Sequence, residues 1–430
     1  MNLAVASLCA LVIAIILSCT SKINIGVLAV VMAWIIGVYF GGMSLAEINA
    51  GFPTQLFLTL AGVTLLFTLA EVNGTLGKLA FRAVRSCRGN AGVIPIMFFV
   101  LALVFGSIGP GSIASVALLG PMAMAVAGQT GISPFLMTIM VANGAQASSL
   151  SPIAPTGIIV SGLMEKIGLP DTEWYCYLLL LVAHTVVGFA GYIVLGGWRL
   201  FRQGVGEPPV AVSETVAVAR SDLPDVARGF ERPHWVTLAV IVVVIAVVIG
   251  LDVNVGMASL AGAVVLVLVG AGDEGRALRS MPWGPILMVS GVTVLVALIE
   301  KTGGMDLFSA LLARLASPET VAAVTGFITG TISIYSSTSG VVLPAFLPTV
   351  PGIVSNLGGG DPLAIASSMI VSAHLVDVSP LSTTGALCIA AAPPSADVRW
   401  LFRAMLAWGM SMAVVGALGS HVVFGLLWSR

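Results

Sequence analysis

The sequence predicts an all-α polytopic membrane protein made of two inverted repeats, each with five transmembrane helices and one re-entrant hairpin. The first observation is composition: 58% of the 430 residues are hydrophobic and only 9% are charged, against about 25% charged in soluble domains. The second is that apolar runs recur along the chain, each long enough to cross a hydrocarbon layer about 30 Å thick. The third is that the two halves of the chain match each other.

This composition excludes several classes of protein. A soluble enzyme and a disordered chain both carry far more charge, and a β-barrel would show short alternating segments instead of long apolar runs. Nucleic acid is excluded as a partner because the net charge is −1 and no basic cluster is dense enough to neutralise phosphates. The five cysteines show no CxxC spacing and are interpreted as packing residues. The partner that remains is a lipid bilayer.

Ten apolar runs are interpreted as membrane crossings, two of them interrupted. No basic segment precedes the first run and the second follows almost at once, so the first is interpreted as a helix of the mature protein and not as a signal peptide. In chain order the runs are 3–19, 23–41, 54–72, 133–164 (interrupted), 174–198, 235–251, 254–271, 282–299, 362–391 (interrupted) and 401–427.

Two further apolar stretches, 91–127 and 319–354, each contain a break of small residues near the middle. Either stretch forms two full crossings or one re-entrant hairpin. The halves are short and the breaks are polar without charge, which favours hairpins whose tips stop inside the membrane. The breaks read Gly106-Ser107-Ile108-Gly109-Pro110-Gly111-Ser112 and Ser336-Ser337-Thr338-Ser339-Gly340.

One long polar segment, 199–234, carries five arginines among Glu, Asp and Pro residues. It is too short and too polar to form a core, so it is interpreted as a cytoplasmic linker between a first repeat, 1–198, and a second repeat, 235–430. Two amphipathic stretches at matching positions, 75–88 and 304–316, are interpreted either as surface-lying arms that brace a fixed scaffold or as ordinary surface loops.

The basic residues predict the orientation. If the linker is inside and the hairpins do not count as crossings, 14 of the 18 Lys and Arg residues fall on the inner side, all but Lys166, Lys301, Arg314 and Arg430. This bias predicts ten crossings and two hairpins, with both termini outside. The membrane is predicted to be a bacterial cytoplasmic (inner) membrane.

The two halves are copies of each other. Residues 53–74 align on 282–303 with nine identities in 22 positions. Because each half has five crossings, an odd number, the second copy is predicted to be inverted. Inverted repeats with broken helices at matching positions are typical of secondary transporters. The matches that apolar composition alone does not explain include Pro53/Pro282, Gly62/Gly291, Glu71/Glu300, Pro121/Pro348 and Ser151-Pro152/Ser379-Pro380.

The stretch 89–164 contains no Asp, Glu, Lys, Arg or His, yet it holds the first hairpin break and the interruption Ser149-Leu150-Ser151-Pro152-Ile153-Ala154-Pro155-Thr156-Gly157. Pro152 and Pro155 each remove a helical N–H and disrupt the turn before them. The freed carbonyls need partners in hydrocarbon, so either hydroxyls mend a kinked helix or a bound cation uses the carbonyls. Four breaks in two symmetric pairs favour a binding site.

The second half repeats this device with Val378-Ser379-Pro380-Leu381-Ser382-Thr383-Thr384-Gly385. It adds His374 and Asp377, one helical turn apart and therefore on one face. Ionisable groups inside a membrane are costly and usually functional. The pair is interpreted as a coupling site, in which it serves either as a carboxylate ligand for Na⁺ or as a proton-binding pair.

The substrate is predicted to be an anion. No Arg or Lys lies near the breaks, so bidentate clamping of a carboxylate is absent. A half-helix that begins at a hairpin tip instead offers free N–H groups and a positive dipole end. Two such tips at the midplane suit a small divalent anion with a carboxylate at each end, and cations held by nearby carbonyls supply the remaining positive charge.

The order of hairpin, Pro121, interrupted helix with SLSPIAPTG and a second round ending in VSPLSTTG resembles the ion-transporter superfamily. Within it, residues up to about 165 look like the malonate/dicarboxylate carrier family MatC. The layout is similar to the divalent-anion:sodium symporters and to the large membrane subunit of TRAP transporters. The resemblance covers nearly the whole chain apart from the linker. It implies a homodimer with a static scaffold domain and a transport domain that moves as an elevator.

Carried over by position, the resemblance implies one Na⁺ site at the tip 107–112 and the break 149–157, a second at the tip 336–340 and the break 377–385, and substrate between the tips. The sodium symporters usually show Ser-Asn-Thr at both tips. This chain has Gly-Pro-Gly-Ser and Ser-Ser-Thr-Ser instead, which leaves the substrate contacts and the number of Na⁺ ions open. The counterparts of His374 and Asp377 in the first half are the uncharged Gln146 and Ser149, and this asymmetry leaves proton coupling open. The candidate substrate-binding residues are Ser107, Gly111, Ser112, Thr156, Ser337, Thr338, Ser339 and Thr384. The candidate cation-binding or coupling residues are Gly109, Ser149, Ser151, Pro152, Thr156, Ser336, His374, Asp377, Ser379, Pro380 and Thr383.

The sequence therefore predicts a cation-coupled symporter, with Na⁺ favoured, for a small dicarboxylate such as malonate, with no catalytic residue and no cofactor beyond the coupling ion. One alternative is a proton-coupled symporter that uses His374 and Asp377. Another is a TRAP-type membrane subunit that needs a soluble binding protein. An enzyme is disfavoured because Gly358-Gly359-Gly360-Asp361, which formally matches a GxGD protease, lies outside the spans, and no HExxH or GxSxG motif is present.

Overall fold

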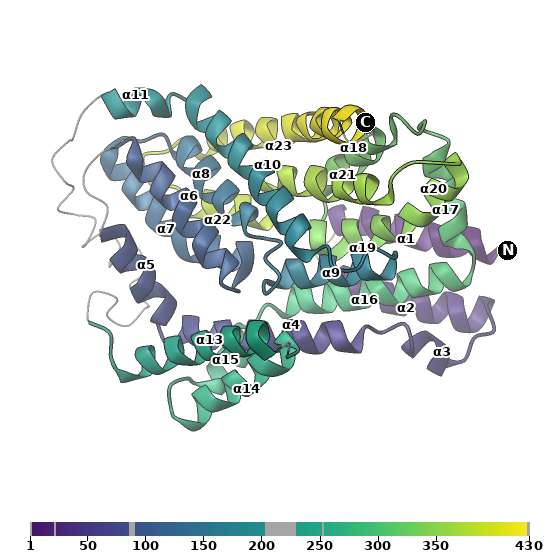
Figure 1. The fold of residues 1–430 in the computed structure, drawn as a ribbon, viewed down its shortest axis with the longest axis horizontal. Helices are drawn as coiled ribbons and strands as arrows, with labels where there is room; N and C mark the ends of the chain where they lie inside the picture. The colour runs from purple at the N-terminus through teal and green to yellow at the C-terminus, as the bar shows by residue number, and fades with distance from the viewer. Residues whose placement is uncertain (1, 21–22, 86–90, 203–228, 252, 428–430) are drawn as a thin grey trace.

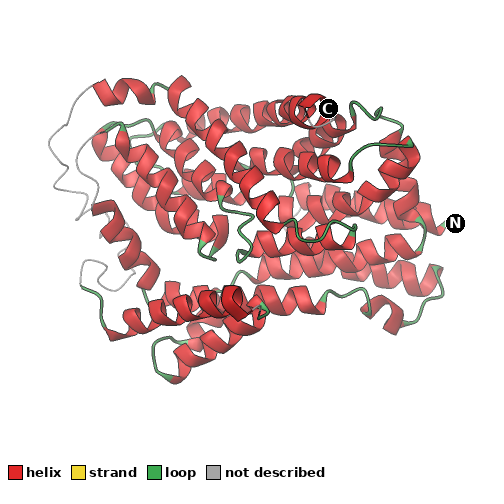
Figure 2. Cartoon of the chain, viewed as in Figure 1, coloured by secondary structure: helices red, strands yellow, loops and turns green. Residues whose placement is uncertain are grey.

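The computed structural model describes residues 2–20, 23–85, 91–202, 229–251 and 253–427 (Figure 1). Within these ranges every regular element is a helix (Figure 2). Helices satisfy the backbone N–H and C=O groups within each segment, which is what a chain of long apolar runs needs in hydrocarbon. Most of the predicted linker, residues 203–228, lies outside the described residues.

The described residues of the first half fold into eleven helical segments. The apolar run predicted at 174–198 is divided at Gly196, whose φ of +85° favours glycine. The segments are α1 (Leu3–Thr20), α2 (Ile25–Trp34) with its π-helical continuation η1 (Ile35–Phe40), α3 (Leu45–Asn49), α4 (Thr54–Val72), α5 (Thr75–Arg85), α6 (Val93–Ser107), α7 (Gly111–Thr130), α8 (Pro134–Ala147), α9 (Pro155–Lys166), α10 (Glu173–Val194) and α11 (Gly197–Arg202).

The second half repeats this order from residue 232 onward. Its first helix begins three residues inside the segment predicted as linker. The segments are α13 (Arg232–Leu251), α14 (Val255–Leu268), α15 (Glu274–Ser280), α16 (Trp283–Lys301), α17 (Gly304–Ala313), α18 (Val321–Ser333), η2 (Thr338–Val342), α19 (Leu343–Phe346), η3 (Leu347–Thr349), α20 (Val350–Leu357), α21 (Pro362–Leu375), η4 (Val376–Val378), α22 (Thr383–Ala390), α23 (Val398–Ser420) and η5 (His421–Leu427).

The helices are those of a polytopic membrane protein. Among the described residues, seven helical stretches are long and apolar enough to cross a membrane. Two of them are the second arms of the predicted hairpins. The seven are Thr54–Val72, Gly111–Gly128, Glu173–Val194, Trp283–Lys301, Thr338–Leu357, Pro362–Ala390 and Val398–Gly425. Several predicted crossings, including 254–271, form shorter apolar helices, here Val255–Leu268.

Matching side chains start matching helices in the two halves. Asn24 accepts hydrogen bonds from two backbone N–H groups at the start of α2, and Asn254 does the same at the start of α14. Ser44 and Glu47 form a capping box on α3, whereas Asp273 alone caps α15. Caps satisfy N–H groups that have no partner inside the helix. The short helices α3 and α15 were not predicted from the apolar pattern, because they contain too few residues for a period.

Two close helix crossings relate the halves. α2 packs on α16, where a Cβ at Gly26 would lie 2.0 Å from the carbonyl oxygen of Leu287 and one at Gly291 would lie 2.0 Å from that of Gly26. α14 packs on α4 in the same way, since a Cβ at Gly62 would lie 2.4 Å from the carbonyl oxygen of Gly256. Small residues let apolar helices approach closely in a membrane. The glycines of one crossing correspond to those of the other at offsets of 229 and 230.

α4 and α16 run antiparallel. The end of α4 lies beside the segment before α16, because the Asn73 side chain donates to the carbonyl of Ala271 at 2.9 Å. The end of α16 lies beside the segment before α4, because Lys301 donates to the carbonyl of Glu47 at 2.9 Å. These contacts fix which positions of the two helices lie at the same level.

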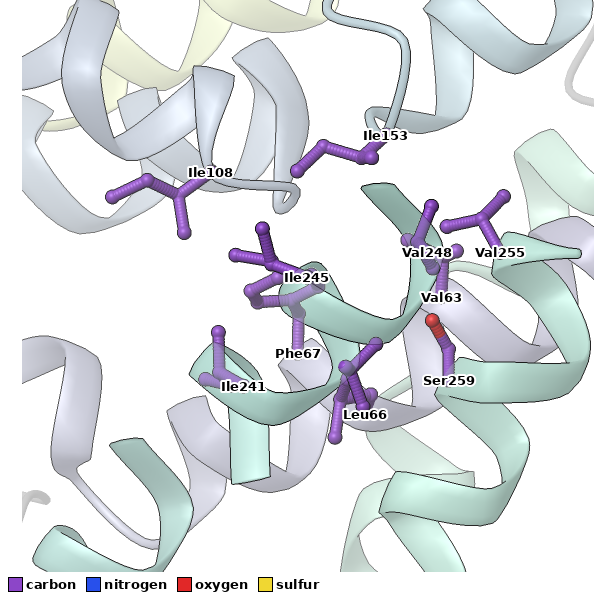
Figure 3. Close-up of a pocket in the computed structure, with 11 residues that line it drawn as sticks. Val63, Leu66, Phe67, Ile108, Ile153, Ile241, Ile245, Val248, Val255 and Ser259 are labelled. Carbon is purple, nitrogen blue, oxygen red and sulfur yellow. The ribbon is translucent and has the colours of Figure 1, made fainter. Parts of the chain in front are cut away.

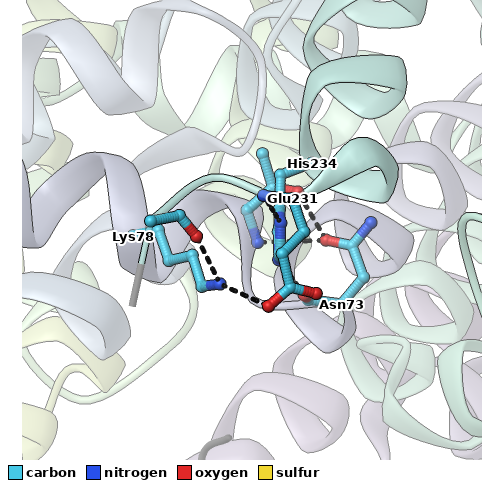
Figure 4. Close-up of polar contacts among 6 residues, drawn as sticks. Asn73, Lys78, Glu231 and His234 are labelled. Atoms are coloured by element: carbon cyan, nitrogen blue, oxygen red, sulfur yellow. Dashed lines mark hydrogen bonds and ion pairs between the residues drawn. The ribbon is translucent and has the colours of Figure 1, made fainter. Parts of the chain in front are cut away.

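A polar cluster fastens the start of α13 to the end of α4 and to α5 (Figure 4). The backbone N–H of Glu231 donates to His234 Nδ1 at 2.9 Å, so Nε2 carries the proton and donates to the carbonyl of Asn73 at 3.1 Å. Lys78, whose side chain is 5% exposed, donates to the carbonyl of Gly229 at 3.1 Å and lies 3.9 Å from the Glu231 carboxylate. The last described residues of the linker are therefore held against the first half.

Among the longer helices of the described chain, α8 and α21 are the most buried. Every residue from Phe135 to Ala147 is buried, and so is every residue from Ala364 to Leu375. Both helices carry several polar residues, yet neither has a face toward solvent or lipid. Each is the first arm of one of the two predicted interrupted segments, so the core of the molecule is built around those interruptions.

Candidate functional site

The first interruption lies between α8 and α9. α8 ends at Ala147, residues 148–154 form turns, and α9 starts at Pro155, which needs no N–H partner in the first turn. The Ser151 hydroxyl donates to the carbonyl of Ser107 at 2.7 Å, and this bond joins the interruption to the tip between α6 and α7. The Ser107 hydroxyl is bonded to Tyr177 of α10 at 2.9 Å.

The first tip fits only glycine at two positions. Gly109 has a φ of +141° and Gly111 has a φ of +79°, both in the region that favours glycine. A Cβ at Gly109 would also lie 2.1 Å from the ring of Phe67 on α4. The tip therefore presses directly on α4.

The second interruption lies between α21 and α22. A short 3₁₀ segment, η4, ends at Val378, and the Ser382 hydroxyl caps α22 by accepting from the N–H of Gly385 at 3.2 Å. The hydroxyls of Ser382 and Thr384 both donate to the backbone carbonyl of Asp377. The carbonyl freed by the break thus has hydroxyl partners inside the protein.

The second tip, between α18 and η2, is bonded to the second interruption. Thr338 Oγ1 donates to Asp377 Oδ1 at 2.7 Å and lies 3.0 Å from the Ser333 hydroxyl. A Cβ at Gly340 would lie 2.4 Å from the sulfur of Met288 on α16. This tip therefore presses on α16 as the first tip presses on α4.

The tips and interruptions enclose a cavity of about 240 Å³. Of the predicted site residues, eleven line it: Ser112, Ser149, Thr156, Ser336, Ser337, Thr338, Ser339, His374, Asp377, Thr383 and Thr384. The lining also includes Ile113, Gln146, Met288, Tyr335, Leu381 and Ser382, which were not among the candidates. The two halves of the chain, far apart in sequence, therefore contribute to one site.

The remaining candidates do not line this cavity. They are Ser107, Gly109, Gly111, Ser151, Pro152, Ser379 and Pro380. Ser107 and Ser151 are engaged in the bonds that join tip to interruption, and Gly109 faces Phe67. Ser379 is fully buried, and its hydroxyl accepts from the N–H of Leu381. These residues shape the backbone behind the cavity.

Helix starts converge on the cavity. Four helical segments present first-turn residues to it: Ser112 of α7, Thr156 of α9, Thr338 of η2, and Thr383 with Thr384 of α22. No side chain caps α7 or α9. The first N–H groups of a helix lack partners within it and carry partial positive charge. The cavity therefore favours negatively charged groups although none of the described Lys and Arg residues lines it.

The cavity also holds one carboxylate and one imidazole, Asp377 and His374. His374 Nδ1 donates to the carbonyl of Ile370 at 2.8 Å, and Nε2 has no hydrogen-bond partner among the described residues. No three His, Cys, Asp or Glu side chains of the described chain lie close enough together to hold a metal ion. The atoms of the cavity that could ligate a cation are hydroxyl, amide and carboxylate oxygens, which suit a hard monovalent cation such as Na⁺ better than a transition metal.

An apolar seam separates the first tip from the helices beneath it (Figure 3). Ile108 of the tip and Ile153 of the interruption face Val63, Leu66 and Phe67 of α4 across a gap of only about 10 Å³. Residues of α13 and α14 complete the seam. All of the described lining residues except Ser259 are apolar, so dispersion contacts hold most of the two sides together.

Comparison with known proteins supports the resemblance drawn from the motifs. Residues 1–149 match the family model described as the dicarboxylate carrier protein MatC N-terminus. The first third of the chain matches the MatC carriers. Two uncharacterized transporters of Mycobacterium tuberculosis, from strains CDC 1551 / Oshkosh and H37Rv, are each 24% identical to this chain over 262 residues. The match spans 60% of this chain and 58% of each relative, so the chain covers little more than half the length of these relatives.

Three of the six lining residues that sequence reasoning missed are Gln146, Met288 and Tyr335. Gln146 carried a signal, because it is the counterpart of His374 at the offset of 228. Met288 lies in an unbroken apolar helix and reaches the cavity only through the packing of α16 against η2. Tyr335 adjoins the second tip, but its type did not fit the small-residue pattern that defined the tips.

Proposed function

We propose that the protein is a secondary active transporter that imports a small dicarboxylate such as malonate together with cations, with Na⁺ favoured. The observation that carries the proposal is the cavity at which four helix starts meet beside Asp377. The match of residues 1–149 to the dicarboxylate carrier MatC model supports the same substrate class. No enzymatic group is needed, since the site is assembled to bind and release.

The size and chemistry of the cavity support a small anion. A volume of about 240 Å³ lies below the range of roughly 300–1,000 Å³ common for drug-sized ligands. Helix starts and hydroxyls bind carboxylates without the tight clamp that Arg would form. A site that binds the substrate through many weak contacts suits a carrier, because the substrate must leave as readily as it enters.

Charge balance supports cation coupling. A dianion beside the Asp377 carboxylate puts three negative charges in a cavity that no Lys or Arg of the described residues lines. Uncompensated charge in a low-dielectric interior is strongly unfavourable. Cations bound at the tips and interruptions supply the balance, so substrate and cation bind together. We place one cation between the tip 107–112 and the break 149–157, and the other between the tip 336–340 and the break 377–385.

The same proposal includes the architecture of the cycle. The repeated helix order, the paired glycine crossings and the antiparallel α4 and α16 support two inverted repeats. α1–α5 and α13–α17 form the scaffold, and the hairpins and broken helices move against it along apolar surfaces such as the seam beneath Ile108. We extend this to a homodimer in the bacterial inner membrane, with the linker inside and both termini outside.

Transport in proteoliposomes tests the function. Uptake of labelled malonate under an inward Na⁺ gradient is expected to exceed uptake in choline, whereas Asp377→Asn is expected to lose the Na⁺ stimulation. Ser112→Ala and Thr338→Ala are expected to raise the apparent KM, because both hydroxyls line the cavity. No uptake of any dicarboxylate under a Na⁺ or pH gradient would remove the proposal.

One observation favours proton coupling as the second candidate. His374 lines the cavity within a helical turn of Asp377, and its Nε2 has no hydrogen-bond partner among the described residues. A protonated imidazole would place a positive charge beside the substrate. A pH gradient that drives uptake in the absence of Na⁺, and fails to do so in His374→Gln, would establish this alternative.

A further inference from the structure

A second hollow of the molecule lies at the elbow between α10 and α11. α10 ends at Val194, and Gly196, whose φ is +85°, turns the chain into α11 (Figure 1). The elbow carries an open crevice of about 370 Å³. Its described lining shares no residue with the substrate cavity and consists of Ile193, Val194, Leu195, Gly196, Trp198 and Arg199.

The elbow is held in one shape by contacts with the start of α6. The Tyr192 hydroxyl donates to the carbonyl of Gly92 at 2.7 Å and lies 2.8 Å from the carbonyl oxygen of Gly197. A Cβ at Gly197 would lie 2.3 Å from the Tyr192 ring, and a Cβ at Gly92 would lie 2.8 Å from Phe201 of α11. Neither glycine has room for a side chain, so the turn that forms the crevice is fixed by close packing.

The crevice combines an apolar wall with an unpaired cation. Ile193, Val194 and Trp198 are each more than half exposed. Arg199 is exposed as well, and its guanidinium has no hydrogen bond or ion pair among the described residues. Trp and Arg at the end of an apolar helix are typical of the boundary between hydrocarbon and lipid headgroups. The crevice therefore offers an apolar surface on one side of this boundary and a positive charge on the other.

The elbow lies at the end of the molecule that the basic residues predict to be inside. In Figure 1 α11, the end of α5 and the start of α13 lie at the same end. α5 carries Arg82 in its last turn, and α13 begins at Arg232. Basic residues near a membrane surface attract anionic lipid headgroups. A lipid phosphate at this level would give Arg199 the partner that the described protein does not supply.

We propose that the α10–α11 elbow binds one anionic phospholipid, with the phosphate on Arg199 and an acyl chain along Ile193 and Val194. Arginine suits this contact because its planar guanidinium forms paired hydrogen bonds with phosphate oxygens. α10 packs on α8 and α21, the helices that lead into the two interruptions. The lipid is therefore bound to the part of the protein that carries the cavity. The inference does not depend on the substrate or on the coupling ion.

Quenching of a fluorophore by spin-labelled lipid tests the site in the full-length protein. The five natural cysteines are replaced, and Val186→Cys is labelled, because it is exposed on α10 two turns before Ile193 on the same face. The protein is reconstituted in phosphatidylcholine vesicles that contain an equal fraction of spin-labelled phosphatidylglycerol or spin-labelled phosphatidylcholine. Val264→Cys, exposed on α14, is the matched control position, since α14 contains no Lys or Arg.

The site predicts a preference for the anionic lipid at the α10 label alone. Phosphatidylglycerol is expected to bind there about fivefold more tightly than phosphatidylcholine, the effect of one basic residue near the surface. At the α14 label the two lipids quench equally. Arg199→Gln abolishes the preference and Arg199→Lys retains part of it. Arg279→Gln, which removes an exposed charge from α15, leaves it unchanged.

Three results overturn the inference. Equal quenching by both lipids at the α10 label means that the crevice does not select an anionic headgroup. A preference that survives in Arg199→Gln, or that Arg279→Gln abolishes as well, means that the general charge of this end attracts the lipid and no site exists. Loss of the preference on addition of inorganic phosphate, but not of chloride at the same ionic strength, means that Arg199 binds a free anion and the acyl chain contributes nothing.

Discussion

The tip between α6 and α7 and the tip between α18 and η2 press on α4 and α16 at levels that the repeat does not equate. The first tip contacts Phe67, near the end of α4, whereas the second tip contacts Met288, near the start of α16. Because α4 and α16 are antiparallel, both contacts lie toward the same end of the pair. This is the end at which Asn73 is bonded to Ala271 and His234. If the repeats are equivalent, a second state exists in which the tips lie toward the other end.

The size of the movement follows from helix geometry. At the offset of 229, the counterpart of Met288 on α4 is Thr59, and the counterpart of Phe67 on α16 is Val296. Each pair of positions is eight residues apart, which is about 12 Å along a helix that rises about 1.5 Å per residue. In the proposed transport cycle, exchange of the two arrangements is therefore expected to move the two tips by about 12 Å along α4 and α16, away from the end at which Asn73 lies.

Disulfide cross-linking between tip and scaffold measures this movement. The five natural cysteines are replaced first. Tyr335→Cys at the second tip is paired with Met288→Cys for the present state and with Val296→Cys for the other state. The first pair is expected to cross-link without ligand, and the second to cross-link when substrate and Na⁺ allow cycling. Either cross-link stops transport, and reduction restores it.

A static tip would refute this reasoning. If the Met288 pair cross-links fully while uptake of labelled substrate continues, the second tip does not leave α16 during transport. A pair of Tyr335→Cys with a cysteine in place of Lys301, at the far end of α16, controls for random collision and is expected not to form.

Three further predictions concern packing and caps. Gly26→Ala is expected to lower the free energy of unfolding by about 1–3 kcal/mol, because its Cβ would lie 2.0 Å from the Leu287 oxygen, while Gly162→Ala, with open space, leaves the thermal midpoint unchanged. His234→Gln keeps an acceptor for the Glu231 N–H, so hydrogen exchange at the start of α13 stays slow, whereas His234→Leu accelerates it. The hydrogen bond from the Ser44 backbone N–H lowers the pKa of the Glu47 carboxyl, and the hydrogen bond from the Ser44 hydroxyl lowers it further. The capping box therefore stabilises α3 above that pKa and is lost as pH falls through it, so exchange at 45–49 accelerates in acid for wild type, while Glu47→Gln shows no such acid-dependent step.

The sequence predicted the structure best at the positions where clusters of Gly, Ser and Pro interrupt the long apolar runs. Both tips and both interruptions lie within the stretches that the Gly, Ser and Pro clusters marked, because those residues cannot continue a helix without a partner for the freed backbone groups. The apolar runs located the long helices because a segment in hydrocarbon must satisfy its own backbone groups, which a helix does. Periodicity could not find α3 and α15, which are defined by caps and not by a buried face.

The residues at helix starts that line the cavity could be predicted from the sequence, but the lining residues from unbroken helices could not. Residues at helix starts, such as Thr156 and Thr384, line the cavity because the breaks put them there. Met288 could not be predicted, since its role depends on how α16 packs against the second tip. Conversely, Ser107 and Ser151 have the right type and position, but they are engaged in bonds that hold tip and interruption together. Which hydroxyls remain for a ligand is decided by tertiary contacts.

The most direct test of the account is uptake of labelled malonate into proteoliposomes that contain only this protein. The account predicts uptake that rises when an inward Na⁺ gradient replaces choline, that collapses when the gradient is dissipated, and that loses its Na⁺ dependence in Asp377→Asn. Uptake of malonate at the same rate with and without either a Na⁺ or a proton gradient would contradict the claim that the cavity couples a dianion to a cation.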